Sequence, residues 1–181
     1  MNQATMLVYV VGGVAVALAV ARNIFFVFMM KINAAMLTAQ LEKLILANNI
    51  DRAIKLCNAV PGKLYSKGAL ALLKAYQEGT HGAKALRQVF EEAIVGHKKR
   101  IALGRVVGIV AFLVAAAGLG YGVINAETVA PEAYAVPGFG ILAAVFGEMS
   151  GPRMIAEAEQ GAKQVIAALG QHYKTEQGQA G

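Results

Sequence analysis

Two uncharged apolar runs dominate the pattern of hydrophobic and polar positions along the chain. The first extends over residues 1–21 and resumes, after two polar residues, over residues 24–30. The second extends over residues 106–126. A helix needs about 20 mostly apolar residues to cross roughly 30 Å of hydrocarbon. The two runs therefore predict transmembrane helices within residues 1–30 and 101–126.

The region after the second span permits more than one interpretation. Residues 133–149 begin with an uncharged stretch that is short for a span and contains one proline and three glycines. The alternatives are a short third span, a re-entrant segment and a helix at the membrane surface. Pro152 is then expected to begin an amphipathic helix over residues 152–174. Residues 175–181 are expected to form a disordered tail.

Residues 31–100 separate the two clear spans and contain apolar positions at helical spacing. An asparagine pair, a Pro-Gly pair and closely spaced glycines divide this region into short helices, and no strand-like alternation occurs. No proline lies between Ala83 and Pro131, so a helix is expected from about Ala83 through Ala126, continuous with the second span. The sequence thus predicts an all-α integral membrane protein with two clear transmembrane helices, a short third as one alternative, and a helical cytoplasmic lobe.

The basic residues indicate an orientation. Of the 17 Lys and Arg residues, 12 lie in residues 31–100, and the net charge is +6. The positive-inside rule places this region in the cytoplasm and the N-terminus outside. Lys98, Lys99 and Arg100 are expected to mark the cytoplasmic interface and to contact lipid head groups. Nucleic acid is not an expected partner, because no recognised module or aromatic-basic stripe is present.

Small residues recur along the second span at steps of four and three. The positions are Gly104, Gly108, Ala111, Ala115, Gly118 and Gly122. These steps place all six on one face of a helix. In lipid, helices associate through close backbone approach, which small residues permit. We therefore expect this face to pack tightly against another helix, either the first span or another subunit.

The composition and motifs give no sign of catalysis. The chain has 181 residues, of which 57% are hydrophobic and 15% charged, whereas soluble domains are about 25% charged. It contains no phosphate-binding loop, nucleophile elbow or zinc-protease motif. Its three histidines are far apart and are interpreted as surface residues, and Cys57 as a small packed hydrophobe. We therefore expect no enzyme activity, cofactor or metal.

The order of segments resembles that of the MotA/TolQ/ExbB family of inner-membrane motor and transport subunits, over about residues 5–126. The similar regions are residues 44–57, residues 61–76, Glu91 or Glu92, and Gly118 with Gly122. Family members have an outside N-terminus, a first span, a helical cytoplasmic lobe, and long helices returning through the membrane. The resemblance implies a multi-pass protein of the bacterial inner membrane that forms a homo-oligomeric ring around single-span partner proteins and serves as a proton channel.

The polar positions of the second span do not match the family. Leu119 occupies the place of a family threonine, and residues 101–125 contain no Ser or Thr. Only Tyr121 and Asn125 offer a polar path, and both lie near the outer end. Three hypotheses follow: an energy-transducing subunit that couples or scaffolds a multi-subunit assembly, a non-conducting structural subunit of a larger membrane complex, and an anchored adaptor that recruits a soluble protein.

Overall fold

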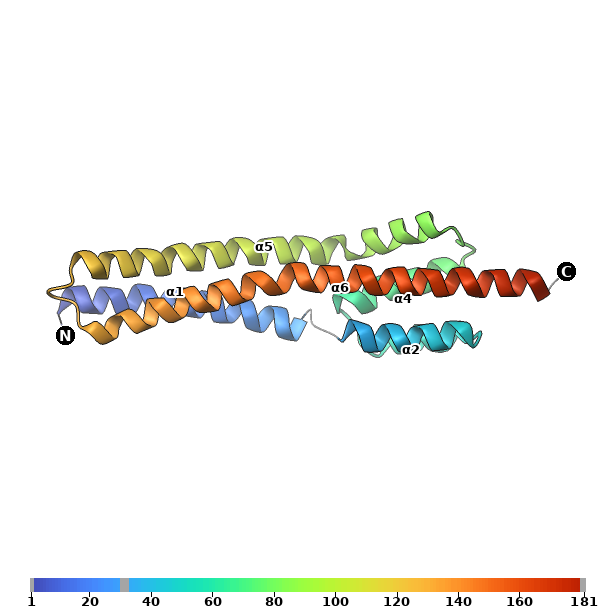
Figure 1. The fold of residues 1–181 in the computed structure, drawn as a ribbon, viewed down its shortest axis with the longest axis horizontal. Helices are drawn as coiled ribbons and strands as arrows, with labels where there is room; N and C mark the ends of the chain where they lie inside the picture. The colour runs from blue at the N-terminus through green and yellow to red at the C-terminus, as the bar shows by residue number, and fades with distance from the viewer. Residues whose placement is uncertain (1, 30–32, 180–181) are drawn as a thin grey trace. The chain divides into compact units, whose positions relative to one another are not determined.

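A computed structural model describes residues 2–29 and 33–179, and nearly all of them are helical (Figure 1). The elements are α1 (Gln3–Met29), α2 (Ala34–Leu46), α3 (Ile50–Asn58), α4 (Leu64–Gln77), α5 (Ala83–Ile124), the short 3-10 helix η1 (Pro131–Tyr134) and α6 (Ala135–Gln179). No strand occurs among the described residues. The predicted all-helical fold class is confirmed.

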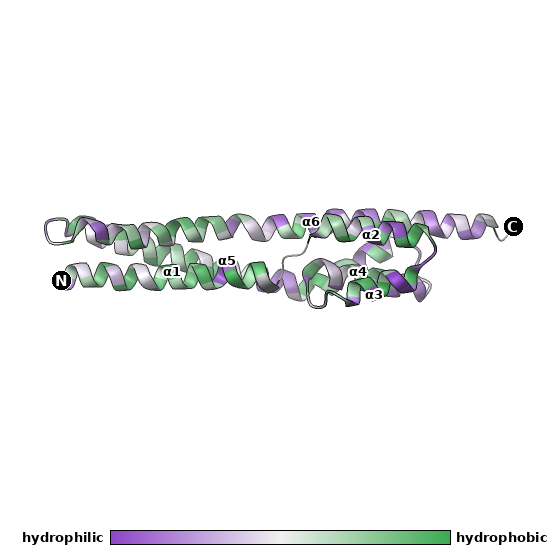
Figure 2. Ribbon diagram, turned by 90° about the horizontal axis from the view of Figure 1, so that it is seen from below, coloured by the Kyte–Doolittle hydropathy of each residue, from purple (hydrophilic) through white to green (hydrophobic). Residues whose placement is uncertain are grey.

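The chain divides into two compact units, and α5 and α6 contribute to both. The unit that we call the apolar unit comprises residues 1–28 and 100–152, and the unit that we call the lobe comprises residues 29–99 and 153–181. Hydrophobic residues are dense along α1 and the adjoining parts of α5 and α6 (Figure 2). Polar residues are more frequent on the helices of the lobe.

Three helical segments are long and apolar enough to cross a membrane. They are Gln3–Val27, Ala83–Ile124 and Pro131–Gly178. Within the apolar unit they pack through small residues, because Ala19 of α1, Ala111 of α5 and Ala144 of α6 form one buried cluster. Large apolar side chains face outward instead. Examples are Val14, Ile24, Leu113, Leu142 and Phe146. Small residues inside and large apolar residues outside are typical of helices packed in lipid.

The third apolar segment differs from the sequence-based expectation. Helix α6 runs without interruption from Ala135 through Pro152 to Gln179, so the predicted start of a separate helix at Pro152 is wrong. The predicted disorder is wrong for residues 175–179, which are helical, while residues 180–181 lie outside the described residues. Proline lacks the N–H that would bond the carbonyl four residues earlier, and its ring crowds that carbonyl, so a helix can continue through it only at a cost. The helix is packed before and after this position, since Ala144 and Ala158 are both buried.

The lobe has its own core between α2, α4 and the parts of α5 and α6 that belong to it. Its largest fully buried side chains include Leu41, Ile45, Tyr65, Leu72, Phe90 and Leu169. Helices approach closely at two glycines: a Cβ on Gly68 would overlap the ring of Phe90, and one on Gly161 would lie 2.6 Å from Thr38 Oγ1. Asn48 ends α2 in the left-handed region, at φ 54°, a conformation that asparagine tolerates.

Candidate functional site

Three charged side chains meet at one end of the apolar unit, one from each long helix. Arg22 of α1 is 2% exposed at its side chain, and its Nη1 lies 3.7 Å from Glu148 Oε2 of α6. Arg105 of α5 forms an ion pair through Nε with Glu148 Oε1. One carboxylate therefore lies between two guanidinium groups. We call Arg22, Arg105 and Glu148 the charge cluster.

Two glycines make room for Arg22. A Cβ on Gly108 of α5 would overlap Arg22 Nη1, and a Cβ on Gly147 of α6 would overlap Nη2. Arg22 Nη2 also donates a hydrogen bond of 3.0 Å to the backbone carbonyl of Ala144. The guanidinium is thus enclosed between the backbones of α5 and α6, and this enclosure fixes the position of α1 against both.

The hydrogen-bonding and charge requirements of the cluster are only partly met. Among the described residues, Arg22 Nε and Nη1 are buried and have no hydrogen-bond partner. Two guanidinium groups against one carboxylate leave a formal charge of +1. An uncompensated charge in an apolar environment is costly, so the cluster favours an additional anion at its accessible side.

A groove opens beside the charge cluster between α5 and α6. Its volume is about 200 Å³, and it is lined by Arg105, Gly108, Ile109, Phe112, Ala144, Val145 and Glu148. One end is charged, because the Arg105 side chain is 68% exposed and that of Glu148 is 34% exposed. The remainder is apolar, with Ile109 and Phe112 exposed along one wall.

The predicted small-residue face of α5 contacts other helices of the same chain. Gly104 lies against the ring of Phe26, Gly108 lies against Arg22, and Ala111 and Ala115 are fully buried. A further contact joins Gly118 to α1, since its added Cβ would lie 3.2 Å from Val11 Cγ1. A Cβ added to Gly122 would lie 2.7 Å from Tyr134 Cε1. The face is therefore occupied by α1, by α6 and by the segment that leads into α6.

The two residues expected to offer a polar path lie at the opposite end of the apolar unit from the charge cluster. Asn125 Nδ2 donates a hydrogen bond of 2.9 Å to the backbone carbonyl of Tyr121, so its side chain caps the end of α5. The Tyr121 side chain is exposed. Between the two ends, residues 10–21, 106–120 and 135–147 contain only apolar side chains and glycine.

The predicted interfacial basic residues have different environments. Lys98 Nζ forms an ion pair of 2.9 Å with Glu159 Oε1 within the lobe. Lys99 and Arg100 are exposed. Lys98 therefore stabilises the contact between α5 and α6 in the lobe, whereas Lys99 and Arg100 remain accessible.

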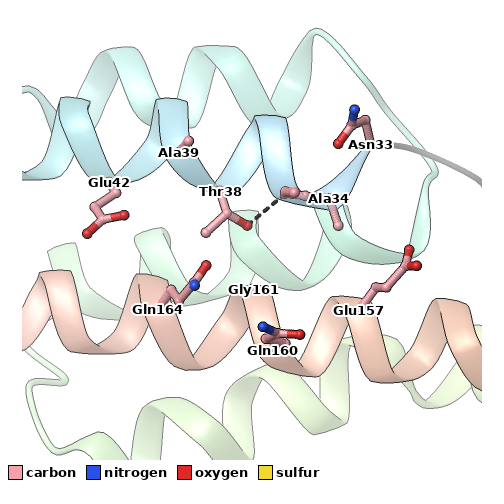
Figure 3. A pocket seen from close by; sticks show the side chains of 10 residues that line it. Asn33, Ala34, Thr38, Ala39, Glu42, Glu157, Gln160, Gly161 and Gln164 are labelled. Atoms are coloured by element: carbon pink, nitrogen blue, oxygen red, sulfur yellow. Dashed lines mark hydrogen bonds between the residues drawn. The ribbon is translucent and has the colours of Figure 1, made fainter.

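A larger cavity of about 620 Å³ lies in the lobe between α2 and α6 (Figure 3). Its lining includes Glu42 of α2 and Glu157, Gln160 and Gln164 of α6, and small residues such as Gly161 form part of its wall. Glu157 is paired with Arg153 on the same helix. Across the described residues, no group of three metal-ligating side chains occurs. The cavity is a polar cleft with an acidic rim.

Two of the three histidines are buried, which corrects their interpretation as surface residues. His97 Nε2 lies 3.0 Å from the carbonyl of Gly62, and His172 bonds through Nδ1 to Tyr76 and through Nε2 to Asn48. These bonds connect turns and helices within the lobe. Cys57 is 1% exposed, and burial raises the pKa of its thiol to about 12, as expected for a packed and inert cysteine.

Comparisons of the chain with protein-family models, curated proteins and solved structures found no match. The sequence analysis missed the partnership of Arg22 with Arg105 and Glu148. The sequence feature that could have indicated this pairing is that Arg22 interrupts the first apolar run and Glu148 ends the third apolar run. The pairing follows from tertiary packing of three helices, which the spacing in sequence does not reveal.

Proposed function

We propose that the chain is a structural, non-conducting subunit of a multi-subunit membrane assembly. The apolar unit is its membrane anchor, and the lobe is the part that attaches to other components outside the bilayer. The observation that supports this most directly is the apolar middle of the three long helices. Over residues 10–21 alone, a helix rises about 18 Å. Ions need polar groups along their route, and this chain offers none over that distance.

The proposed topology has three passes. With the N-terminal end of α1 outside, α1 enters the cytoplasm, α5 returns to the outside, and α6 enters the cytoplasm again. Both parts of the lobe then lie on the cytoplasmic side, and together they contain 14 of the 17 basic residues. This arrangement also assigns the C-terminal half of α6 to the cytoplasm. By resemblance, the membrane is the bacterial inner membrane.

Single cysteines test this topology. In a Cys57→Ala background, Lys67→Cys and Lys174→Cys are expected to react with a membrane-impermeant maleimide only when the cytoplasmic side is open. Glu127→Cys is expected to react from the opposite side in intact cells. Labelling of Lys174→Cys and Glu127→Cys from the same side would contradict three passes.

A proton-conducting subunit of the MotA/TolQ/ExbB type is the second candidate, and one specific observation favours it. Glu148 is a titratable carboxylate on the third apolar helix, and its side chain is one-third exposed beside a groove. The order of one helix, a helical lobe and two long helices is also the layout that the resemblance implies. In this candidate, several copies form a ring, and a single-span partner supplies the polar groups missing from residues 10–21, 106–120 and 135–147.

Flux and mass measurements separate the two candidates. We expect proteoliposomes of the purified chain to show the same proton leak as empty liposomes, and Glu148→Gln to leave that leak unchanged. Native mass spectrometry of the gently solubilised protein is expected to show it bound to unrelated subunits. A symmetric homo-oligomer whose proton flux exceeds the liposome background, and falls in Glu148→Gln but not in Glu157→Gln, would replace the structural proposal with the conducting one.

A further inference from the structure

We propose that the groove between α5 and α6 is a binding site for one anionic phospholipid. Its phosphate pairs with the guanidinium of Arg105, and its glycerol and upper acyl segment lie along Ile109 and Phe112. The proposal concerns the groove of about 200 Å³ beside the charge cluster. It holds whether the chain is a structural subunit or a conducting one, because it depends on the apolar unit alone.

The charge at the groove selects an anion. Glu148 is the single carboxylate of the cluster and is shared between Arg22 and Arg105. Arg22 is held in place by Gly108 and Gly147, and its Nε and Nη1 are buried without hydrogen-bond partners. This fixed positive charge behind the groove weakens the hold of Glu148 on any one guanidinium and leaves the cluster with a formal charge of +1. A phosphate at the mouth of the groove neutralises this excess.

Arg105 is the residue placed to receive the phosphate. Its side chain is 68% exposed, so the guanidinium donors that Glu148 does not use are accessible. A guanidinium can donate two parallel hydrogen bonds to a phosphate, and such pairs are strong where water is scarce. Arg105 follows the exposed Arg100 by about 8 Å along α5, which is within the reach of a lipid head group from the interface.

The shape of the groove favours a lipid over a protein helix. Its walls beyond the charged end are apolar, and Ile109 and Phe112 are exposed there. A volume of about 200 Å³ accommodates a head-group linkage and the first part of an acyl chain, whereas a helix is about 10 Å wide with its side chains. An amphiphile with an anionic head and an apolar chain matches both ends of the groove.

Native mass spectrometry of the full-length protein in mild detergent tests the proposal. Equal amounts of phosphatidylglycerol and phosphatidylcholine with identical acyl chains are added, and retained lipid is counted per protein. We expect one tightly held phosphatidylglycerol, retained at least 10-fold more than phosphatidylcholine. Arg105→Gln is expected to abolish this preference. Lys99→Gln removes the same charge from an exposed position on the same helix and is expected to preserve the preference.

A second variant tests the groove in case Arg105→Gln does not fold. Competition with inorganic phosphate shows whether binding needs the whole lipid or only its phosphate. Ile109→Trp fills the apolar wall without changing charge, and we expect it to reduce retention at least 5-fold. Inorganic phosphate in excess is expected to leave the lipid bound. Equal losses in Arg105→Gln and Lys99→Gln, or no preference in the native protein, would overturn the proposal. Complete displacement of the lipid by inorganic phosphate would also overturn it. So would a copurifying membrane protein that stays bound without added lipid and is lost in Arg105→Gln, because the groove would then bind a protein.

Discussion

Tyr76 Oη lies 2.9 Å from His172 Nδ1, and this hydrogen bond joins α4 to the C-terminal part of α6 within the lobe. His172 Nε2 lies 2.9 Å from Asn48 Oδ1, at the left-handed turn between α2 and α3. The amide oxygen can only accept, so Nε2 carries the proton and Nδ1 accepts from Tyr76. One buried imidazole therefore fixes three segments of the lobe.

The Tyr76→Phe substitution is expected to destabilise the lobe by about 1 kcal/mol, because it leaves His172 Nδ1 without its donor. Tyr173→Phe is the matched control, because among the described residues its hydroxyl accepts a hydrogen bond only from the exposed Gln177. Its removal is expected to cost no more than about 0.5 kcal/mol, as is usual for surface changes. Denaturant unfolding in one detergent measures both. Equal losses would show that the Tyr76 bond adds nothing.

Stability is expected to fall at alkaline pH through groups in the lobe core. Burial raises the pKa of Cys57 from 9.0 to about 12 and that of Tyr65 from 10.0 to about 12. Both groups are neutral when protonated, so their contribution is fully present below their unfolded pKa values and is lost as the pH rises toward the folded values. Unfolding midpoints should decline from about pH 9. In Cys57→Ala the decline should begin about one pH unit later, and an unchanged onset would contradict the role of the thiol.

Adding a methyl group at the Arg22 enclosure is expected to be costly. Gly108→Ala and Gly147→Ala each place a Cβ where the guanidinium lies, so we expect losses of about 1–3 kcal/mol. Gly120→Ala on α5 and Gly138→Ala on α6 are matched controls, since an added Cβ there meets nothing within 4 Å. These controls are expected to be neutral or to gain up to about 1 kcal/mol from helix propensity. Thermal unfolding in a single detergent separates the two groups.

Removing the shared carboxylate is expected to destabilise the apolar unit more than removing an exposed one. Glu148→Gln leaves the buried Arg22 without its counter-charge and should cost about 3 kcal/mol. Glu157→Gln breaks an exposed pair with Arg153 on the same helix and should cost less than about 1 kcal/mol. The double variant Arg22→Met with Glu148→Gln is expected to recover part of the loss. A double variant less stable than Glu148→Gln alone would contradict this account of the charge.

The helices of this chain follow closely from local sequence signals. Gly79 and Gly82 mark the loop before α5, and the helix begins at Ala83, the residue expected from these breaks. Helix α3 begins at Ile50, directly after the asparagine pair that was expected to separate two helices. The apolar run that ends near Ala126 likewise predicts the end of α5 to within two residues of Ile124. Glycine and asparagine interrupt helices wherever they cluster, so these helix boundaries follow from the neighbouring residues alone.

Two features depended on packing and escaped the sequence analysis. Proline is compatible with both the first turn of a new helix and the interior of a bent one, so Pro152 alone does not distinguish them. The structure shows one continuous helix through this position. The pairing of Arg22 with Glu148 joins residues far apart in the chain, and no periodicity in the sequence encodes it. The small-residue face predicted a close helix contact but did not predict that an arginine fills part of it.

The Arg22 enclosure has an evolutionary consequence. The guanidinium of Arg22 fits only while both Gly108 and Gly147 lack a Cβ, so substitutions at these three positions are expected to depend on one another. In descendants of this chain, we expect alanine at position 108 or 147 to occur together with a smaller, uncharged residue at position 22. We likewise expect loss of that arginine to release both glycines from selection. Co-variation among these positions would therefore trace the ancestry of this helix triplet even where overall similarity has faded.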